Sequence, residues 1–106
     1  MIIVNAKLDV KEENTEKIIS LADDLIKESR NHQGNITYNL YRDVVDNSLI
    51  FVEKWESKED LQKHMKEEVF INFGKNTKDL LESEMDVQLY VVDQMDWKEK
   101  KRYVYE

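Results

Sequence analysis

The sequence of 106 residues predicts one α+β domain in which four strands and two helices follow one another in the order βαββαβ. The first observation behind this prediction is the length, which suffices for one domain and is too short for two. The second is that apolar residues alternate with polar ones in some segments and recur every three to four residues in others. The third is that no proline and only two glycines interrupt these segments.

The N-terminal third is expected to form a strand and then a helix. The strand covers Met1–Val10, where every even position is apolar and is expected to face a helix layer. The helix covers about Thr15–Asn31, and its apolar residues share one stripe: Ile18, Ile19, Ala22, Leu25 and Ile26. Asn14 or Thr15 is the expected N-cap. The turn after the helix contains Gly34, which favours a helix stop at that point.

A hairpin is expected next, with strands at Ile36–Asp43 and Leu49–Glu56. The polar residues Asp46–Ser48 supply the turn between the two strands. A second helical region then begins after Ser57, whose hydroxyl can cap the first turn with Asp60 as the capping-box acid.

The second helical region is expected to bend or break at Glu67 and Glu68 and to continue its apolar pattern as far as Leu81. The fourth strand is expected at about Asp86–Val92, where apolar residues alternate again. We therefore expect a domain over residues 1–92 and a charged, aromatic tail over residues 93–106. The tail is expected to pack on another surface because it holds five large apolar residues: Met95, Trp97, Tyr103, Val104 and Tyr105.

The order βαββαβ is that of the ferredoxin-like fold, a four-stranded antiparallel sheet with both helices on one face. The other face has no cover within one subunit and is expected to carry residues such as Ile3, Tyr41, Ile50 and Val52. An exposed apolar sheet face usually binds a partner, so a face-to-face homodimer is expected.

The composition excludes several classes of protein. A net charge of -7 disfavours nucleic-acid binding, and no apolar run is long enough to span a membrane. The N-terminus does not have the pattern of a signal peptide, so a cytoplasmic location is expected. The absence of cysteine excludes thiolate ligands and cysteine nucleophiles, and two histidines far apart in the sequence make a metal site improbable.

His64 is the best candidate for chemistry, because it shares the helical stripe of Leu61 and Met65 and is therefore expected to point inward. A histidine near neutral pKa can take a proton from a phenol or an enolisable carbon. The alternative interpretation is a core histidine that is held by one hydrogen bond. The other histidine, His32, is expected in the turn after the first helix.

The sequence around His64 resembles the antibiotic biosynthesis monooxygenase domain family. The similarity covers about residues 1–92 and rests on an ordered set of motifs. These motifs are Glu53-x-Trp55-x-Ser57, Leu61-x-x-His64 followed by a helix with phenylalanine, Tyr38-x-x-Tyr41-Arg42-Asp43, and Leu89-Tyr90 in the last strand. The resemblance implies a dimeric α/β barrel of ferredoxin-like subunits, with a small pocket between helices and sheet in each subunit.

Family members include cofactor-free oxygenases of quinols and polycyclic phenols, heme-degrading enzymes, and an isomerase of a small phosphorylated signal molecule. The heme-ligating histidine of the family would fall near Gly74 of this chain, and the nearby tryptophan near His64, so heme chemistry is not expected. We expect no cofactor. The candidate pocket residues are Asn5, Asn39, Tyr38, Tyr41, Trp55 and Tyr90, although each of them can equally be a strand-forming core residue.

Three functions remain open at this point. The first is a cofactor-independent monooxygenase of quinol or phenol type that uses molecular oxygen, with His64 as the base and Asn5 or Asn39 and a tyrosine orienting the substrate. The second is an isomerase or other proton-transfer enzyme on a small carbonyl compound. The third is a dimer that binds a small ligand without turning it over.

Overall fold

A four-stranded antiparallel sheet forms one layer of the computed structural model, which describes residues 1–94. The strand order is β2-β3-β1-β4. The bounds of the strands are β1 (Ile2–Leu8), β2 (Asn35–Arg42), β3 (Leu49–Trp55) and β4 (Asp86–Val91). The predicted ferredoxin-like α+β fold is therefore confirmed.

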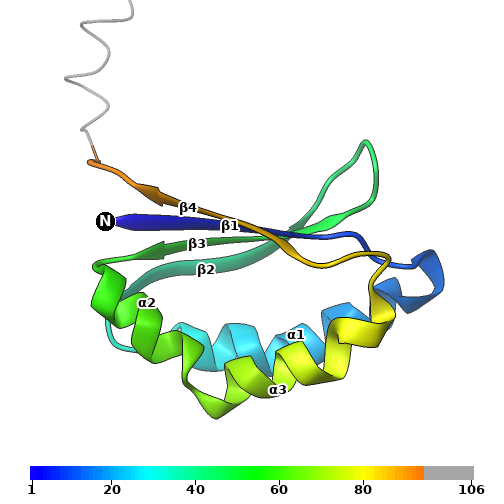
Figure 1. Cartoon of the computed structure of the whole chain (residues 1–106), viewed down its shortest axis with the longest axis horizontal. Coiled ribbons are helices and arrows are strands. Elements are labelled where there is room, and N and C mark those ends of the chain that lie inside the picture. Colours follow the sequence, from blue (N-terminus) through cyan, green and yellow to red (C-terminus); the bar gives the residue numbers. More distant parts are fainter. Residues whose placement is uncertain (95–106) are drawn as a thin grey trace, which may run out of the picture.

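Three helices form the second layer, and Figure 1 shows all of them on the same side of the sheet. They are α1 (Thr15–Ser29), α2 (Lys58–Met65) and α3 (Glu68–Thr77), and short 3-10 turns precede α1 and follow α3. None of the helices in residues 1–94 has the length and apolar character needed to cross a membrane.

The core lies between the two layers, as the alternation in β1 predicts. Ile2, Val4, Ala6 and Leu8 are buried, whereas the residues between them are only half-buried. They belong to one core cluster with the buried stripe of α1, which includes Ile18 and Leu25. β3 follows the same alternation, so that Leu49, Phe51, Glu53 and Trp55 are buried under the helices.

Several local predictions are confirmed. The Ser57 hydroxyl accepts a hydrogen bond from the backbone N–H of Asp60 and caps α2. The same hydroxyl donates to the Asp60 carboxylate at 2.9 Å. The expected break at Glu67 separates α2 from α3, and the Glu67 carbonyl accepts from the N–H groups of Phe70 and Ile71 at the start of α3.

Other local predictions need correction. Asn14 occupies the N-cap position of α1 but does not cap it, because its side-chain amide donates instead to the Leu80 carbonyl. The helix ends at Ser29 and the first strand at Leu8, both two residues earlier than expected. Val10 leaves the strand because it forms an isolated bridge with Leu81, next to the end of the helical region.

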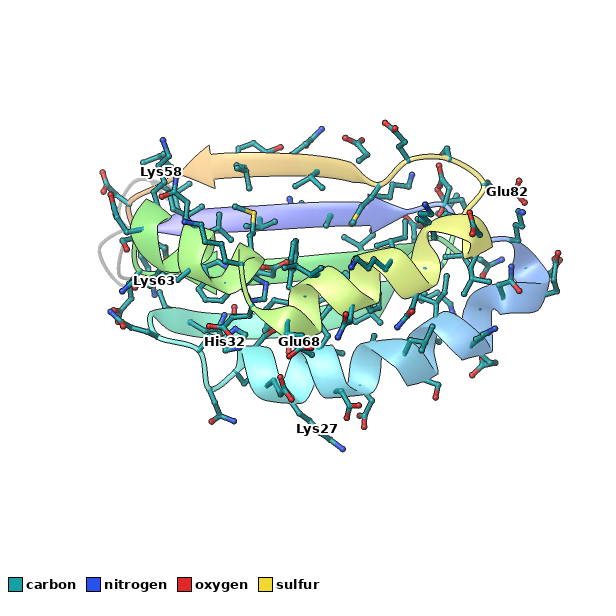
Figure 2. The ribbon with its side chains drawn as sticks, turned by 60° about the horizontal axis from the view of Figure 1, so that its bottom comes forward. Lys27, His32, Lys58, Lys63, Glu68 and Glu82 are labelled. Atoms are coloured by element: carbon teal, nitrogen blue, oxygen red, sulfur yellow. The ribbon has the colours of Figure 1, made fainter. Side chains whose placement is uncertain are left out.

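The second face of the sheet, which we call the outer face, has no helix in the part of the chain that the structure describes (Figure 1). Ile3, Ile50 and Val52 are half-buried there, and Tyr41 next to Ile50 is exposed. β4 is also left without a helix on its inner side, as Figure 2 shows at the edge of the sheet. Apart from Asp93 and Gln94, the predicted tail lies outside the described residues.

Candidate functional site

A cavity of about 130 Å³ lies between the sheet and the pair α2 and α3. Its walls are almost entirely apolar and come from β1, β3, α3 and β4, for example Ala6, Phe51, Phe73 and Leu89. Three of the lining residues carry polar side-chain atoms, namely Tyr38, Glu53 and His64. An apolar space with a few polar groups is the usual form of a small-molecule site.

His64 lies on α2 and is 1% exposed. Its ring packs between Trp55, with centroids 4.6 Å apart, and the rings of Phe70 and Tyr38 at 5.1 and 5.4 Å. Nδ1 of His64 lies 2.9 Å from Nδ1 of His32, which belongs to the turn between α1 and β2 and is labelled in Figure 2. Nε2 of His64 is buried and has no hydrogen-bond partner within residues 1–94.

The surroundings of His64 favour its neutral form. Burial and, to a smaller extent, the nearby His32 together lower the pKa of His64 to about 4. Its ring is therefore an uncharged imidazole at neutral pH. A neutral imidazole with one nitrogen in a hydrogen bond and the other free can act as a proton acceptor or donor at that free nitrogen.

Glu53 is the only carboxylate that the described residues bring to this cavity. It is 5% exposed, and its Oε1 accepts a hydrogen bond from Nε1 of Trp55 at 2.9 Å. Burial raises the pKa of Glu53 to about 7, although the bond from Trp55 works against this rise. The pKa values of Glu53 and His64, two of the titratable residues that line the cavity, are thus shifted in opposite directions, a pattern that often marks acid and base partners.

The structure divides the predicted site residues between the two faces of the sheet. Tyr38 and His64 line the cavity, and Trp55 packs directly behind His64 without lining the cavity. The strand register places the other four predicted residues on the outer face: Asn5, Asn39, Tyr41 and Tyr90. They cannot meet a molecule in the cavity of the same subunit.

Each of these four residues has a separate environment. Asn39 accepts a hydrogen bond from the guanidinium of Arg30 at 3.0 Å. Tyr90 donates its hydroxyl hydrogen to Gln88, its near neighbour on β4. Asn5 lies between Val52 and Gln88 in the strand register, and Tyr41 lies opposite Ile50.

Comparison with known proteins agrees with the resemblance in the sequence. The family model described as antibiotic biosynthesis monooxygenase matches residues 1–76, which include every element from β1 to nearly the end of α3. The chain belongs to the antibiotic biosynthesis monooxygenase family.

Individual proteins are similar to the chain over most of its length. YcnE of Bacillus subtilis, provisionally named a monooxygenase, is 33% identical over 82% of this chain and 93% of its own. The uncharacterized protein sll1783 of Synechocystis is 32% identical over 86% of this chain, which spans only 63% of that protein. A structure from Nitrosomonas europaea, provisionally named an antibiotic biosynthesis monooxygenase, has a TM-score of 0.83 over 87% of this chain and 98% of its own. At 15% identity it shows the shared fold.

A second hollow is larger but does not suit proton transfer by buried titratable groups. It measures about 630 Å³, is open to solvent and is lined by exposed acidic side chains near the start of α1, such as Asp9, Glu12 and Glu16. Neither histidine contributes to it. Within residues 1–94, no three histidine, aspartate or glutamate side chains lie close enough to hold a metal ion. The smaller cavity, which buried titratable residues line, is therefore the candidate site.

Sequence reasoning missed two polar residues of this site. Glu53 has a signal in the sequence, because it occupies an inward position of β3 between Phe51 and Trp55, where alternation calls for an apolar residue. His32 has no such signal, since its contact with His64 joins residues 32 positions apart across a turn. The contact follows from the docking of α2 against that turn and is visible only in three dimensions.

Proposed function

We propose that this family member is a cofactor-independent monooxygenase that acts on a quinol or phenol with one aromatic ring. The observation that carries this proposal is Nε2 of His64, which is buried and has no hydrogen-bond partner within residues 1–94, on a residue that lines an apolar cavity. A bound phenol would donate its hydroxyl hydrogen to this nitrogen, and the apolar walls would keep water from the resulting electron-rich anion. Such an anion can pass electrons to molecular oxygen without a cofactor.

The reaction is written for benzene-1,4-diol as a probe. The diol and one molecule of oxygen give hydroxy-1,4-benzoquinone and one molecule of water. One oxygen atom replaces a ring hydrogen, the other leaves as water, and the diol supplies the four electrons that both atoms take up. His64 accepts the first hydroxyl proton and returns a proton to the departing oxygen.

The size of the cavity supports a substrate with one ring. A cavity of about 150 Å³ holds benzene in a protein core, and the present cavity measures about 130 Å³. Benzene-1,4-diol therefore fits with a small adjustment of the exposed Met65, which lies on the wall. A fused two-ring diol such as naphthalene-1,4-diol would need a larger displacement of the walls and is expected to react more slowly.

The test is oxygen consumption with benzene-1,4-diol, measured against the rate without protein. His64→Gln keeps a polar side chain but cannot carry the proton, so kcat/KM should fall roughly 100-fold to 10,000-fold. Lys63→Gln, at an exposed position of the same helix, is the matched control and should leave the rate unchanged. Full activity in His64→Gln, or no acceleration by the native protein, would contradict the proposal.

An isomerase or other proton-transfer enzyme on a small carbonyl compound is the second candidate. The observation that favours it is the pairing of Glu53 and His64 at one cavity with oppositely shifted pKa values. Hydroxyacetone in deuterated water without oxygen is a suitable probe. Uptake of deuterium next to the carbonyl, lost in Glu53→Gln and in His64→Gln, would favour this candidate, and a true oxygenase would stop without oxygen.

The homodimer and the cellular location are further parts of the proposal. The helix-free outer face, with its half-buried aliphatic residues, supports pairing with a second copy of the chain. In that arrangement Asn5, Asn39, Tyr41 and Tyr90 would lie near the subunit contact. Binding of the diol without any turnover would instead favour a non-catalytic ligand-binding dimer. The cytoplasmic location is testable by cell fractionation.

A further inference from the structure

The contact between the two histidines is not used by the proposed reaction and calls for its own explanation. His64 is closed off from solvent, whereas His32 is only half-buried. Their Nδ1 atoms lie 2.9 Å apart, within hydrogen-bond distance. Backbone hydrogen bonds fix the turn at His32, because the N–H of His32 donates to the Ser29 carbonyl and the His32 carbonyl accepts from the N–H of Asn35.

We propose that His32 and His64 form a proton relay that connects Nε2 of His64, a residue that lines the cavity, with the solvent at His32. The relay rests on the proposed function, in which His64 exchanges a proton with the substrate. It assigns His32 a positioning and proton-carrying role, because His32 does not line the cavity and acts only through His64.

The short contact restricts the two neutral rings to two arrangements. In the first, Nδ1 of His64 donates to Nδ1 of His32, so that Nε2 of His64 carries no hydrogen and is a base. His32 then carries its hydrogen on Nε2. In the second arrangement, Nδ1 of His32 donates to His64, which must therefore carry its own hydrogen on Nε2 and is an acid.

One proton taken from the cavity converts the first arrangement into the second. Nε2 of His64 accepts the proton, and the hydrogen on Nδ1 of His64 passes to Nδ1 of His32. His32 is then an imidazolium and releases the hydrogen on its Nε2 to solvent. The reverse sequence returns a proton from solvent to the cavity, so charge balances in each direction and neither ring has to turn.

The surroundings of the pair determine where the positive charge rests. The groups that face His64 are Tyr38 from β2, Trp55 from β3, Phe70 from α3 and His32 from the turn, and Glu53 from β3 shares its cavity. An imidazolium is stabilised by water, which reaches His32 and not His64. The relay thus moves the charge outward and leaves a neutral ring beside the substrate.

The test follows ring nitrogens and ring hydrogens of the full chain, labelled with nitrogen-15, by NMR. In the native protein, His64 should be neutral at pH 7. The hydrogen between the rings should exchange with solvent quickly. His32→Gln keeps an oxygen that accepts from Nδ1 of His64, so His64 should keep its hydrogen on Nδ1, but exchange should slow at least tenfold.

Gln33→Ala, at the next exposed position of the same turn, is the control and should leave both the nitrogen shifts and the exchange rate unchanged. His32→Phe removes the hydrogen-bond partner of Nδ1 of His64. The hydrogen of the neutral His64 ring should then no longer be confined to one of its two nitrogens. Unchanged exchange in His32→Gln, or a charged His64 in the native protein at pH 7, would overturn the relay.

These NMR measurements need no substrate, so they separate the relay from the proposed reaction. If oxygen consumption is found and His32→Gln exchanges at the native rate, the reaction stands and the relay is wrong. If no substrate reacts and exchange slows as expected, the relay stands without the oxygenase. Where both hold, His32→Gln should lower kcat at least tenfold with little change in KM.

Discussion

The pairing of Glu53 with His64 in one cavity gives the protein two opposed dependences of stability on pH. The pKa of Glu53 rises from 4.5 to about 7 on folding, so its contribution to stability falls as the pH rises through this range. The pKa of His64 falls from 6.5 to about 4, so its contribution falls as the pH drops through that range. Between about pH 4.5 and 6.5 the two effects should largely cancel.

Single substitutions should reveal each dependence. The change in the free energy of unfolding from pH 4.5 to pH 8 should be more favourable in Glu53→Gln than in the native protein, by up to about 3 kcal/mol. His64→Gln should show the opposite change, with improved stability near pH 4.5. Urea unfolding across this pH range measures both, and parallel pH profiles for native protein and variants would contradict the assignment.

Gly34 gives a prediction that depends on its backbone conformation and on the side chain of Asp60 beside it. It has a φ of +78°, and an added Cβ would overlap the Asp60 carboxyl group at the start of α2. Gly34→Ala should therefore destabilise the fold by about 2–4 kcal/mol, through strain and displacement of α2. Gly74→Ala is the control, because it lies on α3 with no atom within 4 Å of the new Cβ. It should stabilise α3 by about 0.5–1 kcal/mol, as thermal unfolding can show.

At the level of elements, the cap of α2 matters because this helix carries His64. Ser57→Ala removes the side-chain acceptor for the Asp60 N–H and should cost about 1 kcal/mol of unfolding free energy. Ser20→Ala, at an exposed position inside α1, serves as the matched control with an effect near zero. Equal effects of the two substitutions in urea unfolding would show that the cap does not stabilise α2.

Elements and their inward faces could be predicted from the sequence because periodicity reports burial directly. Buried and half-buried residues alternate over the whole length of β1, and Ser57 is the N-cap that indicates the start of α2. The end of β1 could not be predicted, because Val10 pairs with Leu81 in an isolated bridge. That pairing joins residues far apart in the sequence.

The candidate site was predicted in part for the same reason. The position of His64 on an apolar helical stripe predicts that it points inward, and it does. The prediction that Asn5 and Asn39 share this pocket is wrong for a single subunit, because side chains alternate along a strand and those of Asn5 and Asn39 point to the outer face. The contact of His64 with His32 depends on how a helix docks on a turn, and no local pattern encodes that.

For the whole molecule, the outer face predicts the state of assembly. Light scattering after size exclusion should give twice the chain mass of 12.7 kDa. Val52 lies at the centre of this face between Asn5 and Asn39, so Val52→Asp would place a charge in the proposed contact and should yield monomers. Ile71→Asp makes the same change on exposed α3 and should leave the dimer intact. A native monomer at micromolar concentration would contradict the proposed pairing.

The position of β4 has a consequence for how a guest molecule reaches the interior. This strand is bonded to the sheet along one side only and all six of its residues are exposed, yet Val87 and Leu89 form part of the cavity wall. A wall held by a single ladder opens at lower cost than one held by packed helices. Brief opening of β4 would admit an aromatic ring to the cavity, while the helices, His32 and His64 keep their positions. Amide hydrogens of β4 should therefore exchange fastest among the strands, and a tight-fitting guest should slow them selectively.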